Sequence, residues 1–226
     1  MDIRGMKPAE AIAKFINEEV FPTVEPFGFK WHKNLSMVRH LGNYRQEIHV
    51  EKSKWNMTDA VVQFDLRIST SSKTFRKWYI NFYQTKKDAI IPDGGAGGGI
   101  QSCKNWDHTL IPYNYGFDLM TLDHEVLGRY FRENIVKGFI PDLDYISDYK
   151  NIVDIHTRHE SYGTFPYGID LCLEQNDFKL AKTLIEQFDA FLPTYKGKRN
   201  EPYPQNIIDA IELRRDLLKE MMEGKR

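Results

Sequence analysis

The sequence is poor in cysteine, in long apolar runs and in excess charge of either sign. Its two cysteines, Cys103 and Cys172, lie far apart without Cys-x-x-Cys spacing, which favours reduced structural thiols over a disulfide framework or a zinc site. The 31 Lys and Arg residues against 32 Asp and Glu residues give a net charge of −1, so no overall field attracts nucleic acid or an anionic membrane. Any such partner needs a local patch.

Segments that direct a chain to a membrane are also missing from the pattern. No stretch approaches the roughly 18 apolar residues of a membrane span, and the first residues, "MDIRGMKPAEAIAKF", lack the apolar core of a signal peptide. We therefore expect a cytoplasmic protein with no membrane partner. The pattern says nothing about its oligomeric state.

What the sequence does contain is enough apolar surface for a folded core. Of its 226 residues, 41% are hydrophobic and 13% aromatic, whereas disordered chains lack the apolar surface that offsets ordering entropy. We expect one α+β domain over residues 1–226, with a sheet part at about 1–110 and a helical part at about 120–226.

The sheet part is predicted to be an N-terminal helix packed on an antiparallel four-stranded meander. Apolar residues at helical spacing indicate a helix over about 8–20. Alternating apolar and polar residues indicate the strands, and Gly42 with Asn43 suits a tight hairpin turn between the first two. The four strands are expected at residues 35–41, 44–52, 60–70 and 75–84.

The rest of the chain is predicted to be mostly helical. An apolar stripe from Leu127 to Ile135 indicates a helix that ends at Gly138, where a left-handed cap is allowed, and Pro141 follows it. Asp177 is a good N-cap for a second helix. A third follows the linker-like segment "PTYKGKRNEPYP", which is too short to prove a domain boundary.

The run "DGGAGGGIQSCK" invites a phosphate-binding interpretation, but it fails both glycine motifs. Ile100 stands where a P-loop needs lysine and where a dinucleotide fingerprint needs its third glycine. We therefore interpret the run as a flexible surface connection and expect no nucleotide cofactor.

Metal and catalytic motifs are incomplete too. His156, His159 and Glu160 follow the order H-x-x-H-E, which matches no zinc-protease pattern, and two histidines alone do not complete a zinc site. No serine lies in G-x-S-x-G, and neither cysteine has a nucleophile signature. We expect no metal and favour a protein that is not an enzyme. An enzyme whose polar cleft is concealed by sequence order stays open.

Residues 73–87 combine lysine and arginine with aromatic rings, as a strand that binds RNA does. The alternative is a core strand with solvated lysines at its ends. Because alternation assigns Trp78, Ile80 and Phe82 to the core, we do not expect a nucleic-acid partner, and RNA binding through this strand is kept as an alternative function.

Aromatic residues among Pro, Gly and Asn are the expected binding surface, since such loops stay near solvent and tyrosine suits recognition. The alternative is that these rings pack as lids on the core. The candidate binding residues are Tyr113, Tyr115, Phe117, Tyr162, Phe165 and Tyr167.

The stretches "GFKWHKN", "IHVEKSKW" and "VVQFDLRIS" resemble domain-of-unknown-function family 4304 over roughly residues 27–70. The chain departs from that family at Glu51, where glutamine is usual, and at "FDLRIS", where a glycine commonly ends the strand. The resemblance implies an α+β fold and no particular activity. We expect a non-catalytic binding or inhibitory module, similar in role to an immunity protein, with a protein partner.

Overall fold

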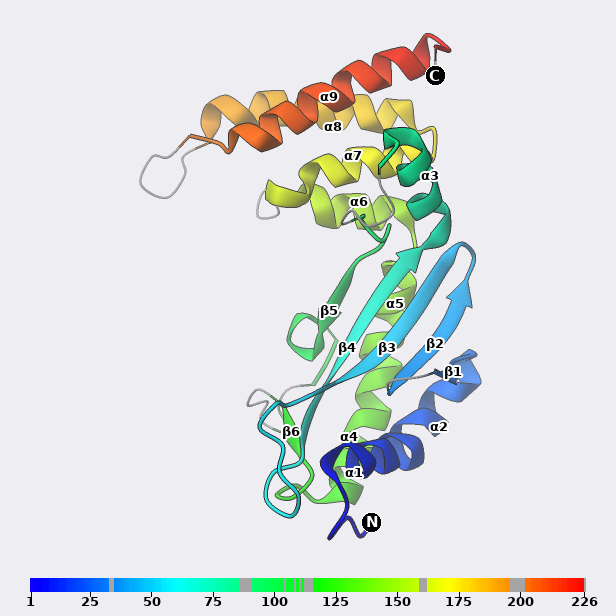
Figure 1. Ribbon diagram of the computed structural model, residues 1–226, viewed down its shortest axis with the longest axis vertical. Helices are drawn as coiled ribbons and strands as arrows, with labels where there is room; N and C mark the ends of the chain where they lie inside the picture. The colour runs from blue at the N-terminus through cyan, green and yellow to red at the C-terminus, as the bar shows by residue number, and fades with distance from the viewer. Residues whose placement is uncertain are drawn as a thin grey trace. The chain divides into compact units, whose positions relative to one another are not determined.

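The computed structural model describes residues 1–32, 35–85, 91–103, 105–107, 109, 111, 116–158, 162–195 and 202–225 (Figure 1). The chain forms two compact units, each built from two separate stretches. The sheet unit comprises Met1–Ser71 and Ala96–Ser147, and the helical unit comprises Ser72–Gly95 and Asp148–Arg226. The α+β class is confirmed. The division differs from the expected one because the chain leaves the sheet unit at residue 72 and returns to it at residue 96.

The sheet has the order β1-β2-β3-β4-β5, with β6 also paired to β4. The hairpin between β2 and β3 turns at Gly42 and Asn43, as predicted: Leu41 pairs with Tyr44, and the φ of Gly42 is +56°. The strands are β1 (Lys30–His32), β2 (Ser36–Leu41), β3 (Tyr44–Lys52), β4 (Gln63–Ser72), β5 (Gly97–Gly99) and β6 (Phe117–Asp118).

The fourth predicted strand, 75–84, is wrong: the structure has helix α3 (Lys73–Tyr83) there. The hydroxyl of Ser72 caps this helix by accepting a hydrogen bond from Phe75 N at 3.2 Å. The rings at positions 75, 78, 79, 82 and 83 fit helical spacing, and Trp78 stacks on Phe82 at 4.6 Å. The aromatic strand that RNA binding needs is therefore not formed by residues 73–83.

The glycine run supplies the next strand of the sheet. Strand β5 pairs antiparallel with β4, with Ser69 opposite Gly97 and Arg67 opposite Gly99, and η3 (Ile100–Ser102) follows. A Cβ at Gly97 would lie 2.7 Å from the backbone oxygen of Ile68. Gly97–Gly99 are therefore not the loose connection expected, and at Gly97 glycine permits a close backbone approach.

Two interrupted helices belong to the sheet unit. The first runs through α1 (Pro8–Phe15), η1 (Ile16–Val20), α2 (Phe21–Val24) and η2 (Glu25–Phe27). The second runs through α4 (His124–Asn134), η4 (Ile135–Phe139) and α5 (Ile140–Tyr145). In each, a π turn precedes a proline that opens the next helical segment.

The predicted helix end at Gly138 is wrong, because the chain stays helical through η4 and α5. A Cβ at Gly138 would lie 2.7 Å from the sulfur of Cys103. This glycine therefore permits close packing of the helix rather than a left-handed cap.

Aromatic side chains form the core of the sheet unit. Phe15, Phe64, Phe117 and Phe131 are each no more than 1% exposed, and the rings of Phe117 and Phe131 meet edge to face at 4.8 Å. These rings join α1, β4, β6 and α4. The N-terminal helix thus contributes to the core of the sheet unit.

In the helical unit, Asp177 caps α8 as predicted by accepting a hydrogen bond from Leu180 N at 3.1 Å. The unit contains α3, α6 (Tyr149–Thr157), η5 (Tyr162–Thr164), α7 (Phe165–Glu174), α8 (Phe178–Phe191), η6 (Leu192–Thr194) and α9 (Gln205–Met222). Across the described residues, no helix has the length and apolar character that crossing a membrane requires.

Candidate functional site

The structure places the expected aromatic binding residues unequally. Phe117 is fully buried and Phe165 is 8% exposed, so for these two rings the packing alternative holds and the binding assignment is corrected. Phe117 is buried because it pairs with Phe64 across the sheet. Tyr167 is half-buried, and its hydroxyl accepts a hydrogen bond from Gly95 N at 3.0 Å. Tyr113, Tyr115 and the side chain of Tyr162 lie outside the described residues.

Of the three residues in the histidine motif, the structure describes only His156. His156 lies near the end of α6, with Nε2 3.1 Å from the carbonyl oxygen of Gly95 and its ring 4.5 Å from the ring of Tyr167. Burial lowers the pKa of His156. His159 and Glu160 lie outside the described residues, and the described ones contain no group of three His, Cys, Asp or Glu side chains placed for a metal.

The most exposed large apolar side chain of the described chain is in a different loop. Trp55 is 73% exposed and Met57 is 59% exposed, and both lie in residues 53–62, which join β3 to β4. We call these residues the β3–β4 loop. Contiguous exposed apolar surface marks interaction sites, and tryptophan is enriched among the residues that dominate binding energy at interfaces.

Hydrogen bonds hold the backbone of the β3–β4 loop in one conformation. The amide of Asn56 donates to Gln63 O at 2.8 Å and accepts from Gln63 N at 2.7 Å. Met57 N donates to Val61 O at 2.8 Å, which closes the loop tip. Asp59, at a φ of +58°, accepts from Gly5 N at 2.7 Å. The exposed side chains of Trp55 and Met57 are therefore presented by an ordered turn.

Two exposed lysines lie close to Trp55 in the sequence. The ammonium of Lys54 lies 5.0 Å from the ring centre of Trp55, and Lys52 is also exposed. Glu51, the nearest acidic residue before the loop, pairs with Arg67 at 2.7 Å. Trp55 therefore lies close in sequence to two exposed lysines, Lys52 at the end of β3 and Lys54 in the loop, while the exposed Asp59 of the same loop accepts a hydrogen bond from Gly5 N.

A hollow of about 330 Å³ lies at the base of this loop and is the nearest feature to the polar cleft of an enzyme. Its lining includes Glu51, Ser53, Asp65 and Arg67. Glu51 and Arg67 are each 48% exposed and neutralise one another, as in a solvated surface ion pair. Asp65, the other carboxylate of the lining, is half-buried and accepts a hydrogen bond from Leu66 N at 2.8 Å.

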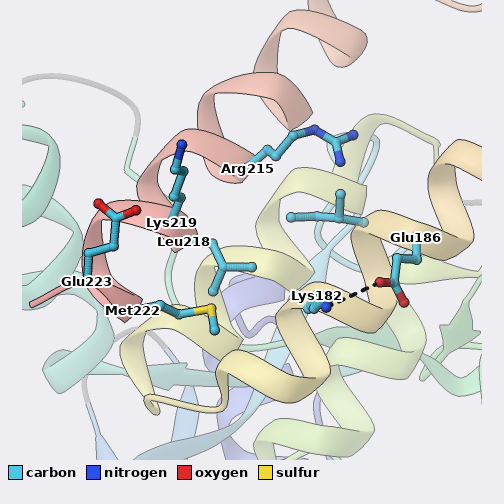
Figure 2. Close-up of a pocket in the computed structure, with 8 residues that line it drawn as sticks. Lys182, Glu186, Arg215, Leu218, Lys219, Met222 and Glu223 are labelled. Atoms are coloured by element: carbon cyan, nitrogen blue, oxygen red, sulfur yellow. Dashed lines mark ion pairs between the residues drawn. The ribbon is translucent and has the colours of Figure 1, made fainter.

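Two further hollows lie in the helical unit. One, of about 480 Å³, runs between α8 and α9 and is shown in Figure 2. The other, of about 640 Å³, has Phe165, Phe188 and Tyr203 among its lining residues and the ion pair of Asp154 with Arg158 beside them. The aromatic hollow has a floor that is nearly buried, since these three rings are each at most 8% exposed.

The strongest electrostatic cluster of the helical unit is buried and structural. Asp170 on α7 is 1% exposed and accepts a hydrogen bond from a terminal nitrogen of Arg214 at 2.6 Å. Tyr83 donates its hydroxyl proton to the other carboxylate oxygen. Arg214 also donates to the carbonyl oxygens of Pro166 and Ala210. Burial raises the pKa of Asp170, while Arg214 and Tyr83 oppose that rise. These groups satisfy each other and stabilise the packing of α3, α7 and α9.

Comparison of the chain with known proteins finds no matching family model, curated relative or solved structure. The resemblance of residues 27–70 to domain-of-unknown-function family 4304 therefore stays a prediction. The site is defined by its own geometry, and the sequence analysis missed it. The available signal is that Trp55 and Met57 lie in the polar segment "SKWNMTD", outside both alternating strands.

Proposed function

We propose that this chain is a non-catalytic, cytoplasmic protein-binding module, inhibitory in the manner of an immunity protein, and that its contact surface is the β3–β4 loop. The observation that supports this proposal is the 73% exposure of Trp55 on a loop held by side-chain hydrogen bonds. The function rests on shape and charge, and it requires no cofactor.

The physical argument concerns the free energy of leaving Trp55 in water. Burying a large apolar side chain is worth about 1.5–3 kcal/mol, and the fold forgoes this gain at both Trp55 and Met57. Tryptophan is enriched among the few residues that dominate binding energy at interfaces. Because the loop is already ordered, a partner that covers it loses little conformational entropy there.

The proposed partner is a folded protein with an apolar pocket rimmed by acidic side chains. The pocket takes the indole of Trp55, and the acidic rim faces the exposed lysines Lys52 and Lys54. Rim charges of this kind mainly raise the association rate and are screened by salt. The association rate should therefore fall as ionic strength rises.

The test begins with capture from a native lysate on the wild-type chain and on the variant Trp55→Ala, followed by titration of the purified partner. We expect Trp55→Ala to raise the dissociation constant of the complex about 30-fold or more, because it removes a tryptophan that anchors the interface. The free energy of unfolding should change little, because the side chain is solvated in the free protein.

Trp31→Ala is the matched control, since Trp31 is a 39% exposed tryptophan of the same unit and lies on β1. It should bind the partner as the wild type does. Equal affinity of Trp55→Ala and wild type, or recovery of nucleic acid instead of an acidic protein, would contradict the proposal.

A further inference from the structure

The groove between α8 and α9 has an apolar floor and an exposed apolar edge. Ile185 and Leu218, which are 3% and 6% exposed, form the floor. Met222 lies near Leu218 (Figure 2) and is 62% exposed. Charged side chains surround this strip on both helices. A strip of this kind is suited to being covered by another helical surface.

The charges follow the same order on both helices. On α8, Lys182 precedes Glu186 by one turn, and both are more than 60% exposed. Along α9, Arg215 and Lys219 precede Glu223, the residue that follows the helix. Within the chain Arg215 pairs with Asp189 and Glu212, and Glu223 pairs with Lys225, so contact with a second copy exchanges these pairs as well. Along each helix, the basic side chains that border the groove therefore come before the acidic side chain.

A two-fold axis perpendicular to α8 reverses this order in a second copy. An axis that passes midway between Lys182 and Glu186 places Lys182 of one copy opposite Glu186 of the other, and Glu186 opposite Lys182. The same rotation places Arg215 opposite Glu223 when the axis passes at the level of Lys219. The groove is thus complementary in charge to itself in an antiparallel arrangement.

We propose that the α8–α9 groove is the contact face of a homodimer in which α8 runs antiparallel to its copy and α9 to its own. Met222 is then covered by the apolar strip of the second copy. The ion pair between Lys182 and Glu186, at 3.8 Å within one helix, exchanges for pairs between the two copies. Among the charged residues of the groove, Lys219 is the one that lies opposite the same residue, Lys219, of the second copy.

The decisive experiment is sedimentation equilibrium of the full chain with exchanged charges. We expect wild type to show a reversible monomer–dimer equilibrium. Lys182→Glu and Glu186→Lys should each raise the dissociation constant of the dimer about tenfold or more, because like charges then face one another. Mixing these two variants should restore association as a heterodimer, since opposite charges face again.

Two more variants sharpen the test. Lys219→Gln should strengthen the dimer, because it removes the like-charge contact at the axis. Lys179→Glu, at an exposed position of α8 outside the groove, makes the same charge change as Lys182→Glu and should leave the equilibrium unchanged.

A chain that stays monomeric at the highest concentration overturns the inference, whether or not another protein binds this face. A dimer that is insensitive to the charge reversals, or mixed variants that fail to associate, also overturns it. Because Trp55 lies outside these helices, the outcome is independent of the proposed partner of the β3–β4 loop.

Discussion

The two units solve the problem of a buried polar side chain in different ways. In the sheet unit, the fully buried Gln46 donates to Leu143 O at 2.9 Å and to Ser147 Oγ at 2.7 Å, and accepts from Arg39. In the helical unit, Asp170 and Arg214 form a buried ion pair. One interior contains a neutral amide, and the other contains opposite charges.

This difference determines how each unit should respond to the loss of one partner. A neutral amide carries only a modest desolvation cost, so its neighbours lose single hydrogen bonds when it is removed. A charge whose partner is removed keeps the full penalty of an uncompensated ion in a region of low dielectric constant. The helical unit should therefore be the more sensitive of the two to one-sided substitution.

The largest expected effect is that of Arg214→Met, which leaves the Asp170 carboxylate buried without its counter-ion. We expect a loss of about 3–5 kcal/mol in the free energy of unfolding, from the cost of breaking one side of a buried pair. Denaturant titration measures the loss, and hydrogen exchange of α7 assigns it to the helical unit. The double variant Asp170→Leu with Arg214→Met should recover most of it, and a double variant as unstable as the single one would contradict this account.

An intermediate effect is expected for Gln46→Leu in the sheet unit. The change removes the hydrogen bonds to Leu143 O and Ser147 and takes away the oxygen that accepts from Arg39 Nε. The Ser147 hydroxyl still donates to Leu143 O at 2.8 Å. We expect a loss of about 1–3 kcal/mol, as for other buried polar groups left without a partner, visible as faster hydrogen exchange in β3. If Gln46→Leu proved as damaging as Arg214→Met, the contrast between the units would disappear.

The smallest effect is a pH dependence confined to the helical unit. Since burial lowers the pKa of His156 below its ordinary 6.5, the unfolded chain binds the proton more readily than the folded chain. Stability from this residue is complete above pH 6.5 and falls as the pH drops from 6.5 toward the lowered pKa. His156→Gln can keep the hydrogen bond to Gly95 and should lose less stability than wild type on acidification.

His40→Gln, on an exposed residue of β2, is the control for this measurement. Its unfolding free energy should follow the wild-type pH profile. Identical pH profiles for His156→Gln and wild type would show that His156 makes no contribution.

Local signals in the sequence were sufficient where one short segment decides the structure. The hairpin turn at Gly42 and the cap at Asp177 each depend on a few neighbouring atoms, and both are found as predicted. The prediction of a strand at residues 75–84 is wrong because the spacing of the aromatic residues there fits both the two-residue period of a strand and the three-to-four-residue period of a helix. The cap from Ser72 and the packing of Phe75 against Tyr167, at 5.3 Å, favour the helix.

The candidate site was less accessible to sequence reasoning than the fold. Aromatic residues in loops occur both on surfaces and over cores, so composition alone could not separate Phe117 from Trp55. Their exposure depends on which strands pair. Phe117 faces the core because β6 joins β4, whereas Trp55 projects from a turn that closes on itself.

The sequence by itself determined the α+β class, the β2–β3 hairpin and the cap of α8, because periodicity and turn chemistry act over a few residues. Tertiary structure alone decided the two-part composition of each unit, the glycine strand β5, the helix through Gly138 and the exposure of Trp55. Those features depend on contacts between residues far apart in the chain, such as Gly97 with Ile68 and Gly138 with Cys103, which no local pattern encodes.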